Sequence, residues 1–130
     1  MKWAVIVARV LVGFAFFASS VLFFLNAMPA QDPPPEGSAL AMFFGAMMPT
    51  GYMNAIKVVE LVGGTLLLVG RFPLVGLTLV TPVAVNILFF EMFLLHGFGP
   101  GHVLVPLCGF LVFAYWSHFQ PVFAIKPKIG

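Results

Sequence analysis

The chain has 130 residues, of which 62% are hydrophobic and 8% are charged. A soluble domain carries roughly 25% charged residues, and a chain this short leaves much of its surface exposed. This composition therefore excludes a soluble globular enzyme and predicts an integral membrane protein. The net charge of +2 is small and its basic residues are scattered, which excludes nucleic acid as a partner because such binding needs a clustered basic face.

The first predicted element is a membrane-spanning helix at residues 3–25, interrupted only by Arg9. A span needs about 20 mostly apolar residues, whereas the apolar part of a signal peptide has about 7–15. We therefore expect this stretch to remain as a membrane helix. Residues 26–38 contain three successive prolines and predict an exposed loop. Residues 39–48 are apolar but about half a span long, which predicts a short interfacial or re-entrant helix.

Three more spans are predicted at residues 52–70, 72–95 and 102–119, followed by a polar-ended tail at 120–130. The predicted fold is an all-α, four-helix integral membrane bundle in a single domain. Basic residues favour the cytoplasmic side of a membrane. Four spans would place all of the basic residues outside them on one side, so we expect both termini to be cytoplasmic; these residues are Lys2, Arg71, Lys126 and Lys128.

Polar side chains inside the spans predict an internal network. An ionisable group within a span costs about 2.5–3.5 kcal/mol on insertion scales, so it usually faces the bundle interior and pairs. Counting depth along the helices predicts an Arg9–Glu60 ion pair, with Lys57 one turn further out. The expected network consists of Arg9, Asn54, Lys57, Glu60 and Asn86. Two interpretations of its charges stay open: a structural ion-pair network or a substrate-handling site. For Asn86 an interhelical hydrogen bond is favoured.

Glycine and proline add packing predictions. Gly13 in the first span and Gly63 and Gly64 in the second are expected to let helix backbones approach closely. Pro82 removes a backbone hydrogen bond and predicts a kink in the third span. Thr78 and Thr81, one turn earlier, are expected to satisfy the freed carbonyls.

A second polar cluster is expected at the outer surface, where Glu91, His96 and His102 flank the third loop. These are acceptable metal-ligand types, but ordinary solvation at the interface is the favoured interpretation and no metal is predicted. The single cysteine, Cys108, excludes an intrachain disulfide and a cysteine-cluster metal site. No catalytic residue is predicted, because the chain contains none of the common nucleophile, phosphate-loop or zinc motifs.

Two signatures resemble the DoxX family of small four-helix membrane proteins. The first is K-x-x-E-x-x-G-G followed by R-F, from Lys57 to Phe72, and the second is P-V-x-x-N-I, from Pro82 to Ile87. The pattern around Arg9 and Gly13 also resembles that family's first helix, so the resemblance covers most of the chain. Two positions depart from the family: Glu91 stands where members often carry His, and Ser19–Ser20 where they often carry Ser-Gly.

The resemblance implies a place in a membrane-bound redox system of a prokaryotic inner membrane. An accessory or anchoring subunit of a quinone-linked complex, in contact with other membrane subunits or further copies of itself, is the preferred hypothesis. Two alternatives stay open. One is a quinone-linked oxidoreductase subunit with its site at Lys57, Glu60 and Asn86; the other is a pathway for protons or small solutes. No bound cofactor is identifiable, and a quinone is the one cofactor that would fit.

Overall fold

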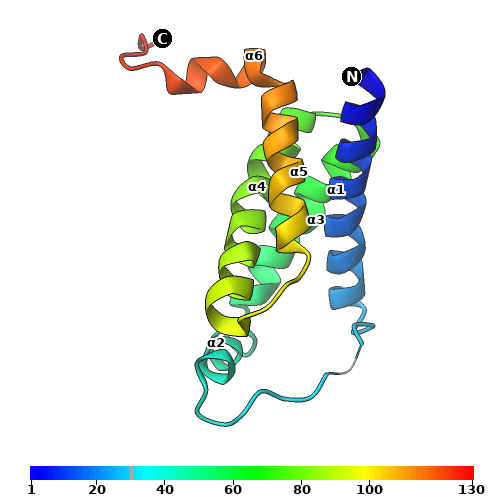
Figure 1. Ribbon diagram of the computed structural model, residues 1–130, viewed down its shortest axis with the longest axis vertical. Coiled ribbons are helices and arrows are strands. Elements are labelled where there is room, and N and C mark those ends of the chain that lie inside the picture. Colours follow the sequence, from blue (N-terminus) through cyan, green and yellow to red (C-terminus); the bar gives the residue numbers. More distant parts are fainter. Residues whose placement is uncertain (30) are drawn as a thin grey trace.

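A computed structural model describes residues 1–29 and 31–130, and all regular structure in them is helical. Four helices lie side by side (Figure 1), and shorter helical segments occupy the two ends. The long helices are α1 (Lys2–Phe24), α3 (Tyr52–Val69), α4 (Pro73–Phe89) and α5 (Gly101–Ala114). The shorter segments are α2 (Ala39–Met47), the π-helix η1 (Phe90–Leu95), α6 (Trp116–Phe119) and the 3-10 helix η2 (Gln120–Phe123).

The four long helices pack as a closed ring. Helix α1 contacts α3 and α5, and α4 contacts the same two helices. Their shared core holds small and branched apolar side chains around one buried aromatic ring: Ala8, Val12, Phe16, Leu67, Leu77, Val80, Ala84, Leu104, Cys108 and Leu111. Large apolar side chains also cover the outer faces, such as Phe14 and Leu11 on α1 and Phe113 on α5. A helix that is apolar on both faces is typical of a membrane span.

Within the residues that the structure describes, three helices are long and apolar enough to cross a membrane: α1, α3, and α4 continued by η1. Helix α5 counts as a fourth only together with the segment that follows it, α6–η2. These lengths and compositions are consistent with a multi-pass membrane protein. The starts of α2 and α4 follow from local chemistry. Pro73 stands at the first position of α4, where its missing N–H is not needed, and the Ser38 hydroxyl accepts a hydrogen bond from the Ala41 amide at the start of α2.

The last predicted span, 102–119, is interrupted. Helix α5 ends at Ala114, and α6–η2 turns away by 80° (Figure 1). The 14 residues of α5 extend about 21 Å, less than the roughly 30 Å hydrocarbon core. Tyr115 and Trp116 stand at the bend, and such amphipathic rings favour the membrane–water interface. This preference accounts for a final segment that leaves the bundle axis.

The third predicted span is helical on both sides of Pro82, where the kink stays a prediction, and a further irregularity lies near its end. Helix α4 runs on to Phe89 and then widens into the π-helix η1. The hydroxyls of Thr78 and Thr81 donate to Leu74 O and Leu77 O, at 2.8 and 2.6 Å. Neither reaches the Thr78 carbonyl, which Pro82 deprives of its usual donor. The prediction that these hydroxyls satisfy the carbonyl freed by Pro82 is therefore wrong, because each hydroxyl bonds the carbonyl four residues before itself.

The two ends of the ring differ. One end, here called the basic end, carries the N-terminus, the α3–α4 turn and the C-terminal segment (Figure 1). The opposite end, here called the loop end, carries the segment after α1, helix α2 and the α4–α5 loop (Figure 1). There α2 packs on the π-helix through aromatic rings, with Phe43 and Phe44 centred 5.2 and 5.7 Å from Phe90.

Candidate functional site

A polar network crosses the α1–α3 interface near mid-bundle. The ammonium of Lys57 lies 3.2 Å from Glu60 Oε2 and donates a hydrogen bond of 2.9 Å to the Ser19 hydroxyl. Glu60 is only 2% exposed. Lys57 also lies 5.7 Å from the ring centroid of Phe23, within cation–π range. The network thus joins a buried carboxylate on α3 to a hydroxyl on α1 through one lysine.

Arg9 lies outside this network, and the expected Arg9–Glu60 ion pair does not form. Among the described residues, Glu60 pairs with Lys57 and Arg9 makes no ion pair. Helical side chains tilt towards the N-terminus of their own helix. Because α1 and α3 run in opposite directions, Arg9 tilts towards the basic end while Glu60 tilts towards the loop end. The long Arg9 side chain was expected to bridge a difference in depth between the two residues, and these opposite tilts widen that difference.

Asn54 and Asn86 also lie outside the network. Both are exposed. The Asn86 amide donates to the Pro82 carbonyl of its own helix at 2.9 Å, so the favoured interhelical hydrogen bond is absent. Asn54 instead lines a surface hollow at the loop end. The partner that sequence reasoning missed is Ser19.

Glycines set the distances between the helices that carry the network. A Cβ on Gly13 would lie 2.6 Å from Leu68 N, and one on Gly64 would lie 2.8 Å from Phe17 N. Backbone therefore touches backbone between α1 and α3. A Cβ on Gly63 would meet Val80 and the Gly76 carbonyl, so Gly63 faces α4. The two adjacent glycines thus serve two different interfaces, which holds Glu60 in a tightly closed region.

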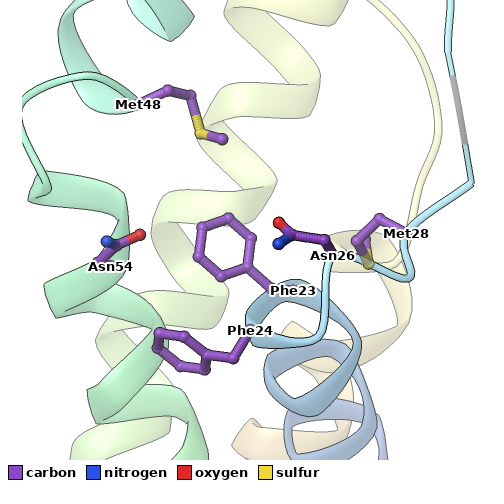
Figure 2. A pocket seen from close by; sticks show the side chains of 6 residues that line it. All are labelled: Phe23, Phe24, Asn26, Met28, Met48 and Asn54. Carbon is purple, nitrogen blue, oxygen red and sulfur yellow. The ribbon is translucent and has the colours of Figure 1, made fainter.

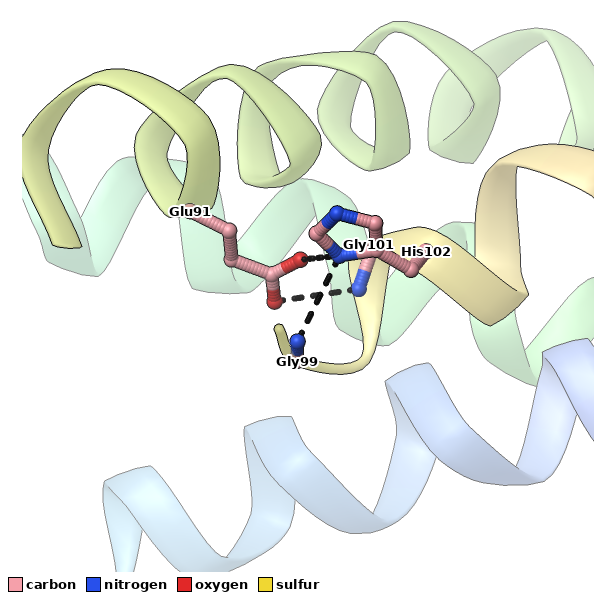
Figure 3. A network of polar contacts seen from close by, with 4 residues as sticks. All are labelled: Glu91, Gly99, Gly101 and His102. Carbon is pink, nitrogen blue, oxygen red and sulfur yellow. Dashed lines mark hydrogen bonds and ion pairs between the residues drawn. The ribbon is translucent and has the colours of Figure 1, made fainter. Parts of the chain in front are cut away.

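A second polar cluster ties η1 to the start of α5 (Figure 3). Glu91 is 2% exposed; its Oε2 accepts a hydrogen bond of 3.1 Å from the Gly101 amide, and its Oε1 lies 3.0 Å from His102 Nδ1. A Cβ on Gly99 would clash with the carboxylate, and one on Gly101 would lie 2.8 Å from Leu88 N. The glycines of this loop therefore allow it to close over Glu91.

The geometry assigns the proton on His102. A ring nitrogen either donates or accepts, and Nδ1 lies 3.0 Å from the Glu91 carboxylate but 3.4 Å from the Gly99 amide. The shorter contact to a carboxylate favours a proton on Nδ1, which leaves the Nε2 lone pair free in the neutral ring. A carboxylate that fixes an imidazole in this way occurs in catalytic and metal sites. The Phe98 ring stacks on His102 at 4.2 Å.

His96 does not join Glu91 and His102 in a ligand set. It is exposed and ends η1 in the left-handed conformation, with a φ of 55°. Across the residues that the structure describes, no three His, Cys, Asp or Glu side chains gather closely enough to hold a metal ion. Cys108 is buried in the apolar core, consistent with a packing role.

One hollow of about 530 Å³ opens at the loop end between α1 and α3 (Figure 2). Its lining combines aromatic rings, two amides and two thioethers: Phe23, Phe24, Asn26, Met28, Met48 and Asn54. The amides of Asn26 and Asn54 face Phe23 from opposite sides in Figure 2. Because Phe23 is also in contact with Lys57, this hollow lies directly beside the mid-bundle network.

Comparison with known proteins adds no relative: no family model, curated protein or solved structure matches the chain. The likeness to DoxX proteins therefore rests on the residues quoted for it.

Proposed function

We propose that the chain is a four-helix membrane subunit with an accessory or anchoring role in a larger membrane assembly. The observation that carries this proposal is that both buried carboxylates are paired within the chain. Glu60 is engaged by Lys57, and Glu91 by His102 and Gly101. Polar groups whose partners come from the same chain stabilise the packing of its helices. The apolar outer faces are available to lipid and to other membrane helices.

The DoxX resemblance supports a role for this assembly in quinone-linked redox chemistry of a prokaryotic inner membrane. The distribution of charge supports an orientation of the chain in the membrane. Lys2 and Arg71 lie at the basic end, as does the C-terminal segment with its two lysines, and basic residues favour the cytoplasm. We therefore propose cytoplasmic termini and four passes, with α5 as a short fourth pass.

Purification from native membranes in mild detergent tests the accessory role. We expect the chain to migrate on native gels in one stoichiometric band with larger membrane subunits. Glu60→Gln should lower the amount of folded chain and of complex together, because the network is structural. Recovery of the chain as a lone monomer with full quinone turnover would contradict the proposal.

The hollow beside Lys57 favours a second function, quinone binding. A quinone ring fits against the rings of Phe23 and Phe24, and its carbonyls are acceptors for the amides of Asn26 and Asn54. The test is photolabelling with a quinone analogue. Asn54→Leu should weaken labelling about fivefold through loss of one hydrogen bond. Asn86→Leu is the matched control, since Asn86 is exposed but does not line the hollow. Equal labelling of both variants would contradict the proposal that the hollow binds a quinone.

A further inference from the structure

Arg9 lies near the basic end but within a span, where a charged side chain is expected to pair with an opposite charge. Arg9 lies seven residues after the start of α1, about 10 Å along the helix. Its guanidinium packs against Gly70, because a Cβ at that position would collide with Nη1. Gly70 ends α3 with a φ of 77°. Gly70 stands at the C-terminal end of α3, where the negative end of the helix dipole favours a cation.

The chain supplies no counterion for this guanidinium. The structure describes all four acidic side chains, and two of them, Glu60 and Glu91, are paired with Lys57 and His102. The other two, Asp32 and Glu36, belong to the segment at the opposite, loop end (Figure 1). Within the described residues, nothing accepts a hydrogen bond from the buried Nε of Arg9. The charge of the guanidinium therefore has no anionic partner among the described side chains, and an anion from outside the chain would compensate it.

Direction and charge indicate what kind of anion this is. The Arg9 side chain tilts towards the basic end, so its Nη atoms approach the membrane surface while Nε stays within the protein. Arg71 follows Gly70 directly in the chain and is exposed, which adds a second cation to the basic end. A guanidinium binds phosphate through two parallel hydrogen bonds, and clustered basic residues at a membrane surface attract anionic lipids.

We propose that Arg9, with Arg71, binds the phosphate of an anionic phospholipid at the basic end of the bundle. The lipid supplies the counterion that the chain lacks, and the glycine at position 70 leaves room for the guanidinium. A zwitterionic lipid binds less well, because its own ammonium group competes for the phosphate. Inorganic phosphate offers the same group without an acyl chain, and it binds more weakly because no apolar contact adds to the interaction.

Native mass spectrometry of the full chain in a neutral detergent tests the proposal. The delipidated protein is titrated with phosphatidylglycerol, phosphatidylcholine or inorganic phosphate. We expect the wild type to prefer phosphatidylglycerol, and Arg9→Gln to bind it about tenfold more weakly through loss of a charged hydrogen bond. Lys128→Gln is the matched control, because it removes an exposed cation from the C-terminal tail. It should change the affinity by less than about twofold, since exposed charges interact weakly.

A second variant, Arg9→Lys, keeps the positive charge within α1 but loses the planar guanidinium group, which binds phosphate through two hydrogen bonds. It should bind phosphatidylglycerol more weakly than the wild type and more tightly than Arg9→Gln. If Arg9→Gln does not fold, Arg9→Lys and the wild-type lipid preference still decide the question. Equal binding by wild type and both variants, equal binding of the two lipids, or displacement of phosphatidylglycerol by millimolar inorganic phosphate would each overturn the proposal.

Discussion

Glu60 and Glu91 are buried to the same extent, at 2% exposure, yet they are held in opposite ways. Glu60 lies within α3, and its charged partner, Lys57, is one turn earlier in the same helix. Glu91 lies in η1, which continues α4, and its partners are ten and eleven residues later, across a loop. A pair within one helix follows from helical spacing alone. A pair across a loop depends on the path of the backbone, and here on glycines that let it approach.

The largest expected effect is on the pair within α3. Glu60→Gln removes the carboxylate and leaves the Lys57 ammonium buried without an anion. Such a loss costs about 3 kcal/mol of unfolding free energy, which can be measured by titration with sodium dodecyl sulfate in mixed micelles. The double variant Glu60→Met with Lys57→Met should recover most of this loss, because it removes both charges. A double variant as unstable as Glu60→Gln would show that the pair is not the source of the effect.

A smaller effect is expected where the loop crosses Glu91. Gly101→Ala places a Cβ 2.8 Å from the backbone nitrogen of Leu88, so α4 and α5 must separate. We expect a loss of about 2 kcal/mol in the same titration, as for other overpacked contacts. Gly97→Ala is the control in the same loop, because its Cβ meets only Leu95 O, at 3.9 Å. Equal losses in the two variants would remove the claim that close approach at Gly101 builds the cluster.

The smallest effect is expected for Glu91→Gln. The amide oxygen of Gln can still accept from Gly101 or His102, so that only the charge is lost and no cation is left buried. We expect a loss of about 1 kcal/mol, which is clearly less than that for Glu60→Gln. Measuring both variants under one set of conditions tests the comparison directly. A loss for Glu91→Gln as large as that for Glu60→Gln would contradict the expected difference between the two pairs.

Part of the candidate site was accessible from the spacing of residues along single helices. Lys57 and Glu60 were placed on one face of a span, and they are the pair that forms. Glu91 and His102 were assigned to one cluster and also meet. Arg9, Asn54 and Asn86 were assigned to the network without being part of it, because depth and helical face were used without side-chain direction. Arg9 tilts away from Glu60, and both asparagines are exposed.

The sequence by itself determined the helical class, the apolar segments and most of the places where helices stop, since these follow from composition, proline and glycine over a few neighbouring residues. Only the tertiary structure decided which polar groups meet between helices. It gave Lys57 the hydroxyl of Ser19, left Arg9 against Gly70 and bent the last span after Ala114. The physical reason is that hydropathy acts locally along the chain. A contact between helices depends on their relative direction, their axial offset and angstrom-level backbone separation, which no single segment encodes.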